Sequence, residues 1–117
     1  MNEKEKLLSR CELFKTLPPE AVAQAAERAT EGRYAAGQPV IVEGQPAPGL
    51  FVVAEGAVDY IKRMDEKNGL VLFRWEEGDV FGIGPVLEGR EALCSAVAQT
   101  DTRCLLLSSD DFAALCQ

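Results

Sequence analysis

The stretch that decides the fold reads EGDVFGIGPVL and spans residues 77–87. Its polar start gives way to Gly82 and Gly84 on either side of Ile83, and Pro85 follows. Glycine allows positive φ angles and close backbone approach, and proline fits the first turn of a helix because its missing N–H would have no partner there. The stretch therefore predicts the end of a strand, a tight turn and a short helix that begins near Pro85. Because a helix N-terminus attracts anions, this stretch is also the first candidate for a binding site.

Length and composition favour a single domain that spans residues 1–117. Hydrophobic residues make up 47% of the chain and charged residues 26%, which is ordinary for a globular protein. No apolar run approaches the roughly 20 residues of a membrane helix, and no signal-peptide core follows the charged start MNEKEK. We therefore expect a cytoplasmic protein without membrane contacts. The net charge of −7 argues against direct nucleic acid binding by this chain, which would need a basic patch.

The residue types that catalysis and metal binding need are scarce. The chain has no histidine, and its four cysteines, Cys11, Cys94, Cys104 and Cys116, form no C-x-x-C pair. A zinc, haem or catalytic Cys/His site is therefore not expected, and we predict no enzyme activity, no metal and no cofactor. The cysteines are interpreted as small buried residues. A minor alternative is a thiol sensor at Cys94 with Cys104.

Helical spacing of apolar residues appears at both ends of the chain. Leu7, Cys11 and Phe14 recur on one face, which predicts a helix over residues 3–15, and Pro19 opens a second helix over 19–29. Both helices fall in an N-terminal helical segment, residues 1–30. A closing helix within residues 109–117 is indicated by Ser108-x-x-Asp111, which resembles a capping box, and by an apolar stripe of Phe112, Leu115 and Cys116.

Short apolar segments separated by glycines fill residues 31–108. This pattern is typical of an all-β sandwich or barrel. The strands are expected at residues 40–42, 50–53, 58–61, 70–75, 93–98 and 104–107. The continuous apolar run at 50–53 predicts burial on both faces. Phe73 and Trp75 are interpreted as packing residues, and the loop at 65–69 as a hairpin in which Asn68-Gly69 supplies positive φ angles.

Several pieces of the sequence, in this order and spacing, carry a family resemblance. They are LFKTLPPE at 13–20, VIVEGQPA at 40–47, LFVVAEGAV at 50–58, GDVFG at 78–82, AVA at 96–98 and LLL at 105–107 before Asp111-Phe112. Together they resemble the cyclic-nucleotide-binding domain of the catabolite activator family and its relatives in kinases and channels. The resemblance covers nearly the whole chain. It implies a mainly β fold, a jelly-roll barrel with flanking helices at both ends, and a regulatory function.

The same resemblance implies a particular binding site, the phosphate-binding cassette. In the family, a glutamate after Phe-Gly holds the ribose hydroxyl, and an arginine about ten residues later pairs with the cyclic phosphate before a serine or threonine. By spacing, Ile83 stands at the glutamate position and Leu93, or Ala92, at the arginine position. The hydroxyl position falls on Cys94 or Ser95, and Pro85 removes a backbone donor. The cassette is therefore interpreted as degenerate.

These departures weigh against a cyclic nucleotide. Burying a phosphate without a partner costs at least several kcal/mol. Each loss of about 1.4 kcal/mol in binding free energy weakens binding tenfold. Arg90 is the candidate for a replacement phosphate contact. We expect Ile83 and Leu93 to fill the pocket and add to the core, or else to line an apolar pocket for a weakly charged ligand. The candidate pocket comprises Phe81, Gly82, Ile83, Gly84, Pro85, Val86, Leu93, Cys94 and Ser95.

The favoured hypothesis is a regulatory or sensor module of this domain type, within a transcription regulator or another signalling protein. It would bind a different small-molecule effector or none and act on a downstream domain or partner protein. A homodimer is compatible with this hypothesis. One alternative is a stand-alone interaction or oligomerisation module with a filled pocket. Another is that cyclic AMP or cyclic GMP binding is retained through non-standard residues.

Overall fold

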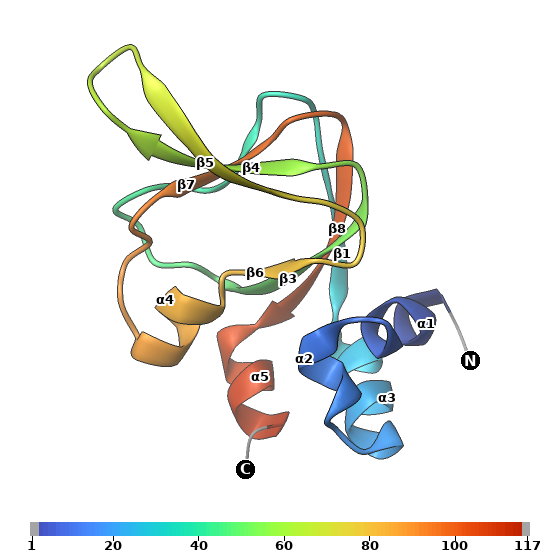
Figure 1. Cartoon of the computed structure of the whole chain (residues 1–117). Coiled ribbons are helices and arrows are strands. Elements are labelled where there is room, and N and C mark those ends of the chain that lie inside the picture. The colour runs from blue at the N-terminus through green and yellow to red at the C-terminus, as the bar shows by residue number, and fades with distance from the viewer. Residues whose placement is uncertain (1–2, 116–117) are drawn as a thin grey trace.

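The computed structural model describes residues 3–115, and its strands form two antiparallel sheets that face each other, with helices gathered at one end (Figure 1). The strands are β1 (Thr30–Tyr34), β2 (Pro39–Ile41), β3 (Gly49–Glu55), β4 (Val58–Arg63), β5 (Gly69–Trp75), β6 (Val80–Phe81), β7 (Ser95–Ala98) and β8 (Thr102–Ser108). The helices are α1 (Glu3–Ser9), α2 (Glu12–Lys15), α3 (Pro19–Arg28), α4 (Ile83–Glu88) and α5 (Ser109–Leu115). One sheet has the order β1-β8-β3-β6 and the other β2-β7-β4-β5. The predicted jelly-roll barrel with flanking helices is confirmed.

Strand β3 explains why one apolar run in the sequence is continuous. Leu50 and Val52 belong to a core cluster shared with α1, α3 and α5. Phe51 and Val53 belong to a second cluster inside the barrel, with Phe81. Because helices cover the outer face of this sheet, both faces of β3 are buried, as the sequence predicts.

The N-terminal helix predicted over residues 3–15 is wrong in one respect, because it is broken at Cys11. Cys11 has an extended backbone, with φ −79° and ψ 134°, and α2 starts after it. The Cys11 thiol lies 3.2 Å from the carbonyl oxygen of Gly78 in the turn before β6. With the helix broken at Cys11, Phe14 on α2 is buried, as are Leu7 and Leu8 on α1.

Two further details differ from the sequence-based expectations. Strand β1 was not expected, because its sequence TEGRY is polar; it forms by pairing with β8 at the edge of its sheet. The loop after β4 does not use positive φ angles at Asn68-Gly69. Instead, the Asp65 carboxylate accepts hydrogen bonds from the backbone of Lys67 and from the backbone and side chain of Asn68.

The C-terminal helix begins as predicted, since the backbone N–H of Asp111 donates to the Ser108 hydroxyl at 3.2 Å. Phe112 is buried against the helical cluster and Leu115 packs beside it, whereas Cys116 lies outside the described residues. No helix in residues 3–115 is long and apolar enough to cross a membrane.

An ion-pair group ties α1 to the barrel. The guanidinium of Arg103 on β8 donates to Glu3 on α1, Glu31 on β1 and Glu55 on β3, at 2.6, 2.9 and 3.1 Å. These three carboxylates raise the pKa of Arg103, chiefly through the bond to Glu3.

Candidate functional site

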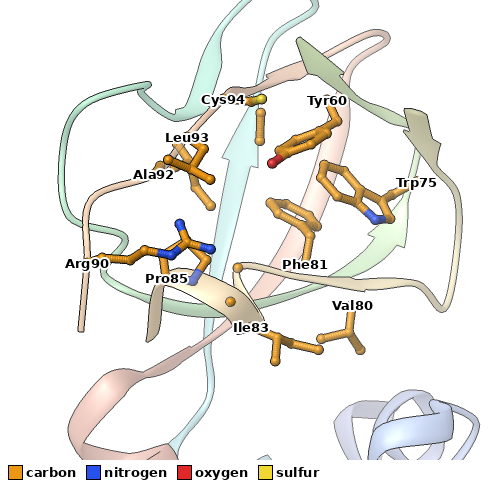
Figure 2. A pocket seen from close by; sticks show the side chains of 14 residues that line it. Tyr60, Trp75, Val80, Phe81, Ile83, Pro85, Arg90, Ala92, Leu93 and Cys94 are labelled. Atoms are coloured by element: carbon orange, nitrogen blue, oxygen red, sulfur yellow. The ribbon is translucent and has the colours of Figure 1, made fainter. Parts of the chain in front are cut away.

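A cavity of about 320 Å³ lies between α4 and the inner face of the β2-β7-β4-β5 sheet, which we call the pocket sheet (Figure 2). Its lining residues are Ile41, Tyr60, Trp75, Val80, Phe81, Gly82, Ile83, Gly84, Pro85, Arg90, Ala92, Leu93, Cys94 and Ala96. The cavity therefore forms where the sequence predicts a binding site, next to the stretch that joins β6 to α4.

The short helix α4 starts at Ile83, slightly earlier than the sequence predicts, with Pro85 in its first turn. Gly82 makes the sharp entry possible because its φ of 90° belongs to the left-handed region. A Cβ atom on Gly82 would also lie 2.7 Å from the carbonyl oxygen of Gly49 on β3. Only glycine fits this position without strain, and it fixes α4 close to β3.

One wall of the cavity is aromatic. Trp75 stacks on Phe81 with ring centroids 4.7 Å apart and an interplanar angle of 18°. Phe81 stacks in turn on Phe51 at 5.1 Å, and the Tyr60 ring meets Trp75 edge-on at 5.1 Å. Because Phe51 and Trp75 cover the two faces of Phe81, a ligand would meet mainly Tyr60 and Trp75 at this apolar aromatic wall.

Tyr60 and Cys94 bring a hydroxyl and a thiol to the cavity lining. A hydrogen bond with the Cys94 thiol and then burial raise the pKa of Tyr60, and Figure 2 shows its hydroxyl pointing into the cavity. Cys94 is only 6% exposed. The Tyr60 hydroxyl is therefore neutral at physiological pH and can donate to or accept from a ligand.

The thiols match the interpretation as buried small residues, as far as residues 3–115 show. Cys11, Cys94 and Cys104 are free and buried. Burial raises the pKa of Cys104 to about 12 and that of Cys11 to about 11, so both remain protonated at neutral pH, and the thiolate is the reactive form. This removes support for a thiol sensor that uses Cys104.

Arg90 is the one charged residue among those that line the cavity. It follows Gly89, the C-cap of α4, and its side chain folds back over the helix. One guanidinium nitrogen, Nη2, lies 3.0 Å from where a Cβ atom on Gly84 would be. Nε pairs with the exposed carboxylate of Glu88, and Nη1 donates to the backbone oxygen of Glu91. A cation therefore lies beside the first turn of α4.

Of the other predicted site residues, some border the cavity and some lie outside it. Ile83 borders the cavity, but its side chain points away from the aromatic wall and packs on the helical cluster (Figure 2). Val86 packs on the same cluster. Leu93 is 59% exposed and also borders the cavity. Ile83 therefore adds to the core, but neither residue fills the cavity; both line it, as the second expectation has it. The Ser95 hydroxyl accepts from the backbone of Glu43 at 2.9 Å, outside this cavity.

Sequence reasoning missed Tyr60 and the role of Trp75. Along β4 and β5 they alternate with Asp59 and Arg74, which form an ion pair with each other. Such alternation is a signal for an inner face, but only the folded barrel brings the two rings together. Within residues 3–115 no group of three or more cysteine and acidic side chains is placed to hold a metal ion.

The family model described as "Cyclic nucleotide-binding domain" matches residues 31–117. The chain belongs to this family, and the resemblance seen in the sequence is confirmed. A cAMP-dependent protein kinase regulatory subunit from Aspergillus niger is 29% identical over 113 residues, covering 95% of this chain and 26% of that protein. The cyclic AMP receptor protein of Thermus thermophilus is 32% identical over 103 residues, covering 88% of this chain and 48% of that protein.

Solved structures agree on the fold. The regulatory subunit of a cAMP-independent protein kinase A from Trypanosoma brucei has a TM-score of 0.88 at 21% identity, over 97% of this chain and 42% of that chain. Of the two sequence relatives named above, this chain covers between a quarter and a half of their length.

Proposed function

We propose that this domain is a regulatory sensor whose pocket binds a small, flat and largely apolar molecule in place of a cyclic nucleotide. The family supports the regulatory part of the proposal, because the matched relatives include a kinase regulatory subunit and a cyclic AMP receptor protein. The proposal extends to the whole protein as a transcription regulator or another signalling protein. The cytoplasmic location and the absence of enzyme activity stay predictions.

The observation that carries the proposal is the chemistry of the cavity lining. An aromatic wall of Tyr60, Trp75 and Phe81 faces aliphatic residues, and no lining residue is acidic. A ribose hydroxyl would thus find no carboxylate, which costs about 1–3 kcal/mol if the group stays unpaired. A flat apolar ligand instead gains from stacking and from burial of its surface.

Arg90 is the observation that favours a second candidate, cyclic AMP or cyclic GMP held through a non-standard residue. Its guanidinium lines the cavity and could approach a phosphate. However, it already pairs with Glu88 and with a backbone oxygen, so a phosphate would have to displace an existing carboxylate partner. We therefore rank this candidate second.

A route for signalling is supported by packing around α4. Ile83 and Val86 of α4, and Phe112 and Leu115 of α5, pack on the same helical cluster. A ligand that holds α4 in one position would bias the position of α5, provided that it binds the two arrangements with different affinity. The output would then pass through α5 to a downstream domain or partner.

The test uses Trp75, the single tryptophan of the chain, as a reporter inside the cavity. Its fluorescence is titrated with naphthalene-2-carboxamide as a neutral flat probe, and thermal shifts are measured in parallel with cyclic AMP, cyclic GMP and the same probe. We expect a saturable change with the carboxamide and none with either nucleotide up to about 1 mM, a limit equal to a binding free energy of about −4 kcal/mol. Saturable nucleotide binding below that limit would contradict the proposal, and its loss in Arg90→Gln would establish the second candidate.

A further inference from the structure

Two polar side chains approach the otherwise apolar cavity from different sides. The Tyr60 hydroxyl points into it from β4, and the Arg90 guanidinium lies at the α4 side (Figure 2). Between them, the lining is aromatic on one side and aliphatic on the other, with Ala92 and Leu93 facing the rings. This arrangement specifies more than apolarity, because it fixes where a ligand can carry polar atoms.

We infer that the pocket selects planar aromatic monocarboxylates, whose ring lies beside Tyr60 and Trp75 and whose carboxylate pairs with Arg90. This inference rests on the proposed function and names the ligand class for the same cavity. A carboxylate matches the fork of an arginine side chain with two parallel hydrogen bonds. The single cation among the lining residues sets the limit at one acidic group.

Gly84 supplies the observation that points to Arg90 as part of the site. The Nη2 atom of Arg90 lies 3.0 Å from the position that a Cβ atom on Gly84 would take, which is closer than an ordinary contact. The absence of a side chain at this position lets the guanidinium lie over the first turn of α4 and face the cavity. Substitution by alanine would push the guanidinium outward without touching the aromatic wall.

The present partner of Arg90 is easily exchanged. Glu88 is 61% exposed at its side chain, and exposed ion pairs contribute only about 0–1 kcal/mol. A ligand carboxylate inside the cavity is better shielded from water than Glu88, so its pairing with the same guanidinium is stronger. Glu88 therefore holds the guanidinium near its place until an acid enters.

Tyr60 defines the other end of the ligand. Its hydroxyl points into the cavity near the Cys94 thiol, and sulfur is a weak hydrogen-bonding group. A ligand hydroxyl or ring nitrogen at the end opposite its carboxylate would replace or join this weak partner. Loss of the hydroxyl in Tyr60→Phe is expected to weaken ligands that carry such a group and to leave plain aromatic acids unchanged.

The experiment compares naphthalene-2-carboxylate with naphthalene-2-carboxamide by Trp75 fluorescence, in the wild-type chain and in the variants Arg90→Gln, Gly84→Ala and Glu88→Gln. The acid should bind the wild type about tenfold to a hundredfold more tightly than the amide, which corresponds to about 1.5–3 kcal/mol for a charged hydrogen bond. Arg90→Gln should make the two affinities equal, and Gly84→Ala should reduce the advantage of the acid. Glu88→Gln, the matched charge-removing control, should keep or raise it.

The outcomes separate the inference from the proposed function. If neither the acid nor the amide binds, the proposed function fails. If both bind with equal affinity, or if the advantage of the acid survives in Arg90→Gln, the ligand class named here is wrong while the apolar pocket stands. A 6-hydroxy derivative of the acid, compared in wild type and Tyr60→Phe, tests the contact with Tyr60 in the same way.

Discussion

Strands β3 and β5 have the same length and nearly the same pattern, GLFVVAE at residues 49–55 and GLVLFRW at 69–75, but opposite surroundings. The first six residues of β3 are buried, whereas the first six of β5 are exposed. Strand β3 lies inside its sheet under the helices, and β5 is the edge of the pocket sheet, in a hairpin that projects away from the helices (Figure 1). An apolar run therefore specifies a strand, and topology alone decides whether that strand is core or surface.

The exposed strand carries one structural protection at its edge. The register of β5 against β4 shifts between Tyr60 and Ile61, so that Leu72 has no direct partner on β4. Such a bulge twists an edge strand and makes continued pairing with other chains less favourable. Strand β3 needs no such device, because β6 and β8 pair with it on both sides.

The sharpest way to break this comparison is the same substitution at the second residue of each strand. Leu50 is 1% exposed and Leu70 is 51% exposed. Leu50→Ala should lower the free energy of unfolding by about 2–5 kcal/mol, and Leu70→Ala should change it by about 0.5 kcal/mol or less. Urea denaturation at low protein concentration measures both, and similar losses would show that β5 is buried in solution.

A smaller effect is expected at the glycines that open the two strands. A Cβ atom on Gly49 would collide with the backbone carbonyl of Leu107, which cannot move without disturbing β8. A Cβ atom on Gly69 would come within 2.6 Å of the Cγ2 methyl group of Ile61, a side-chain contact in an exposed hairpin, and would lie at ordinary contact distance, 3.8 Å, from the backbone oxygen of Lys62. Gly49→Ala should therefore cost about 1–3 kcal/mol and Gly69→Ala clearly less, as thermal unfolding would show. An equal cost would mean that the β5 end of the hairpin is as rigid as β3.

The smallest effect is a pH dependence confined to the hairpin side. Glu43 has a lowered pKa because it accepts from the backbone of Arg63 and from Lys62, and the pKa of Asp65 is lowered by Asn68 and Lys67. Both folded-state values lie below the unfolded ones, so the stabilisation is present above the ordinary carboxylate pKa of about 4 and is lost as pH falls through the folded value.

Amide hydrogen exchange should detect this loss. Exchange in β4 and β5 should accelerate relative to β3 as the pH is lowered from about 5 to about 3, after correction for intrinsic rates. Glu43→Gln should show the faster exchange already at pH 6 and should flatten the pH dependence. If β3 loses protection in parallel with the hairpin, the polar contacts of Glu43 and Asp65 do not act locally.

Much of the fold could be predicted because local patterns and tertiary structure agree. The glycine-spaced apolar segments, the capping residue Ser108 and the stretch around Gly82 all specify elements that form, although α4 starts at Ile83 and the strand expected at 93–98 is shorter, Ser95–Ala98. The polar strand β1 could not be predicted, because its pairing with β8 provides the only reason for an extended conformation. The break at Cys11 coincides with a contact between its thiol and the backbone oxygen of Gly78, which is remote in the sequence.

The candidate site was predictable only in part for the same reason. The sequence located Phe81, Gly82, Arg90 and Cys94, which line the cavity, by their position relative to one turn. It could not show that the Ile83 side chain points to the helices, since direction depends on how α4 meets β3. The contributions of Tyr60 and Trp75 arise from stacking across strands, which spacing along the chain does not encode.

The Arg103 group gives the N-terminal helix two unlike anchors. In the first turn of α1, Glu3 is held by an ion pair with its side chain 72% exposed, and Lys4 donates to the backbone oxygen of Ala29 at 2.8 Å. Leu7 and Leu8 further along are held by burial. At about 1 M salt the Debye length shrinks to about 3 Å, which weakens the first anchor and leaves the second intact. At this salt concentration the first turn of α1 should fray and become a site for protease cleavage, while the rest of the helix stays packed against the helical cluster.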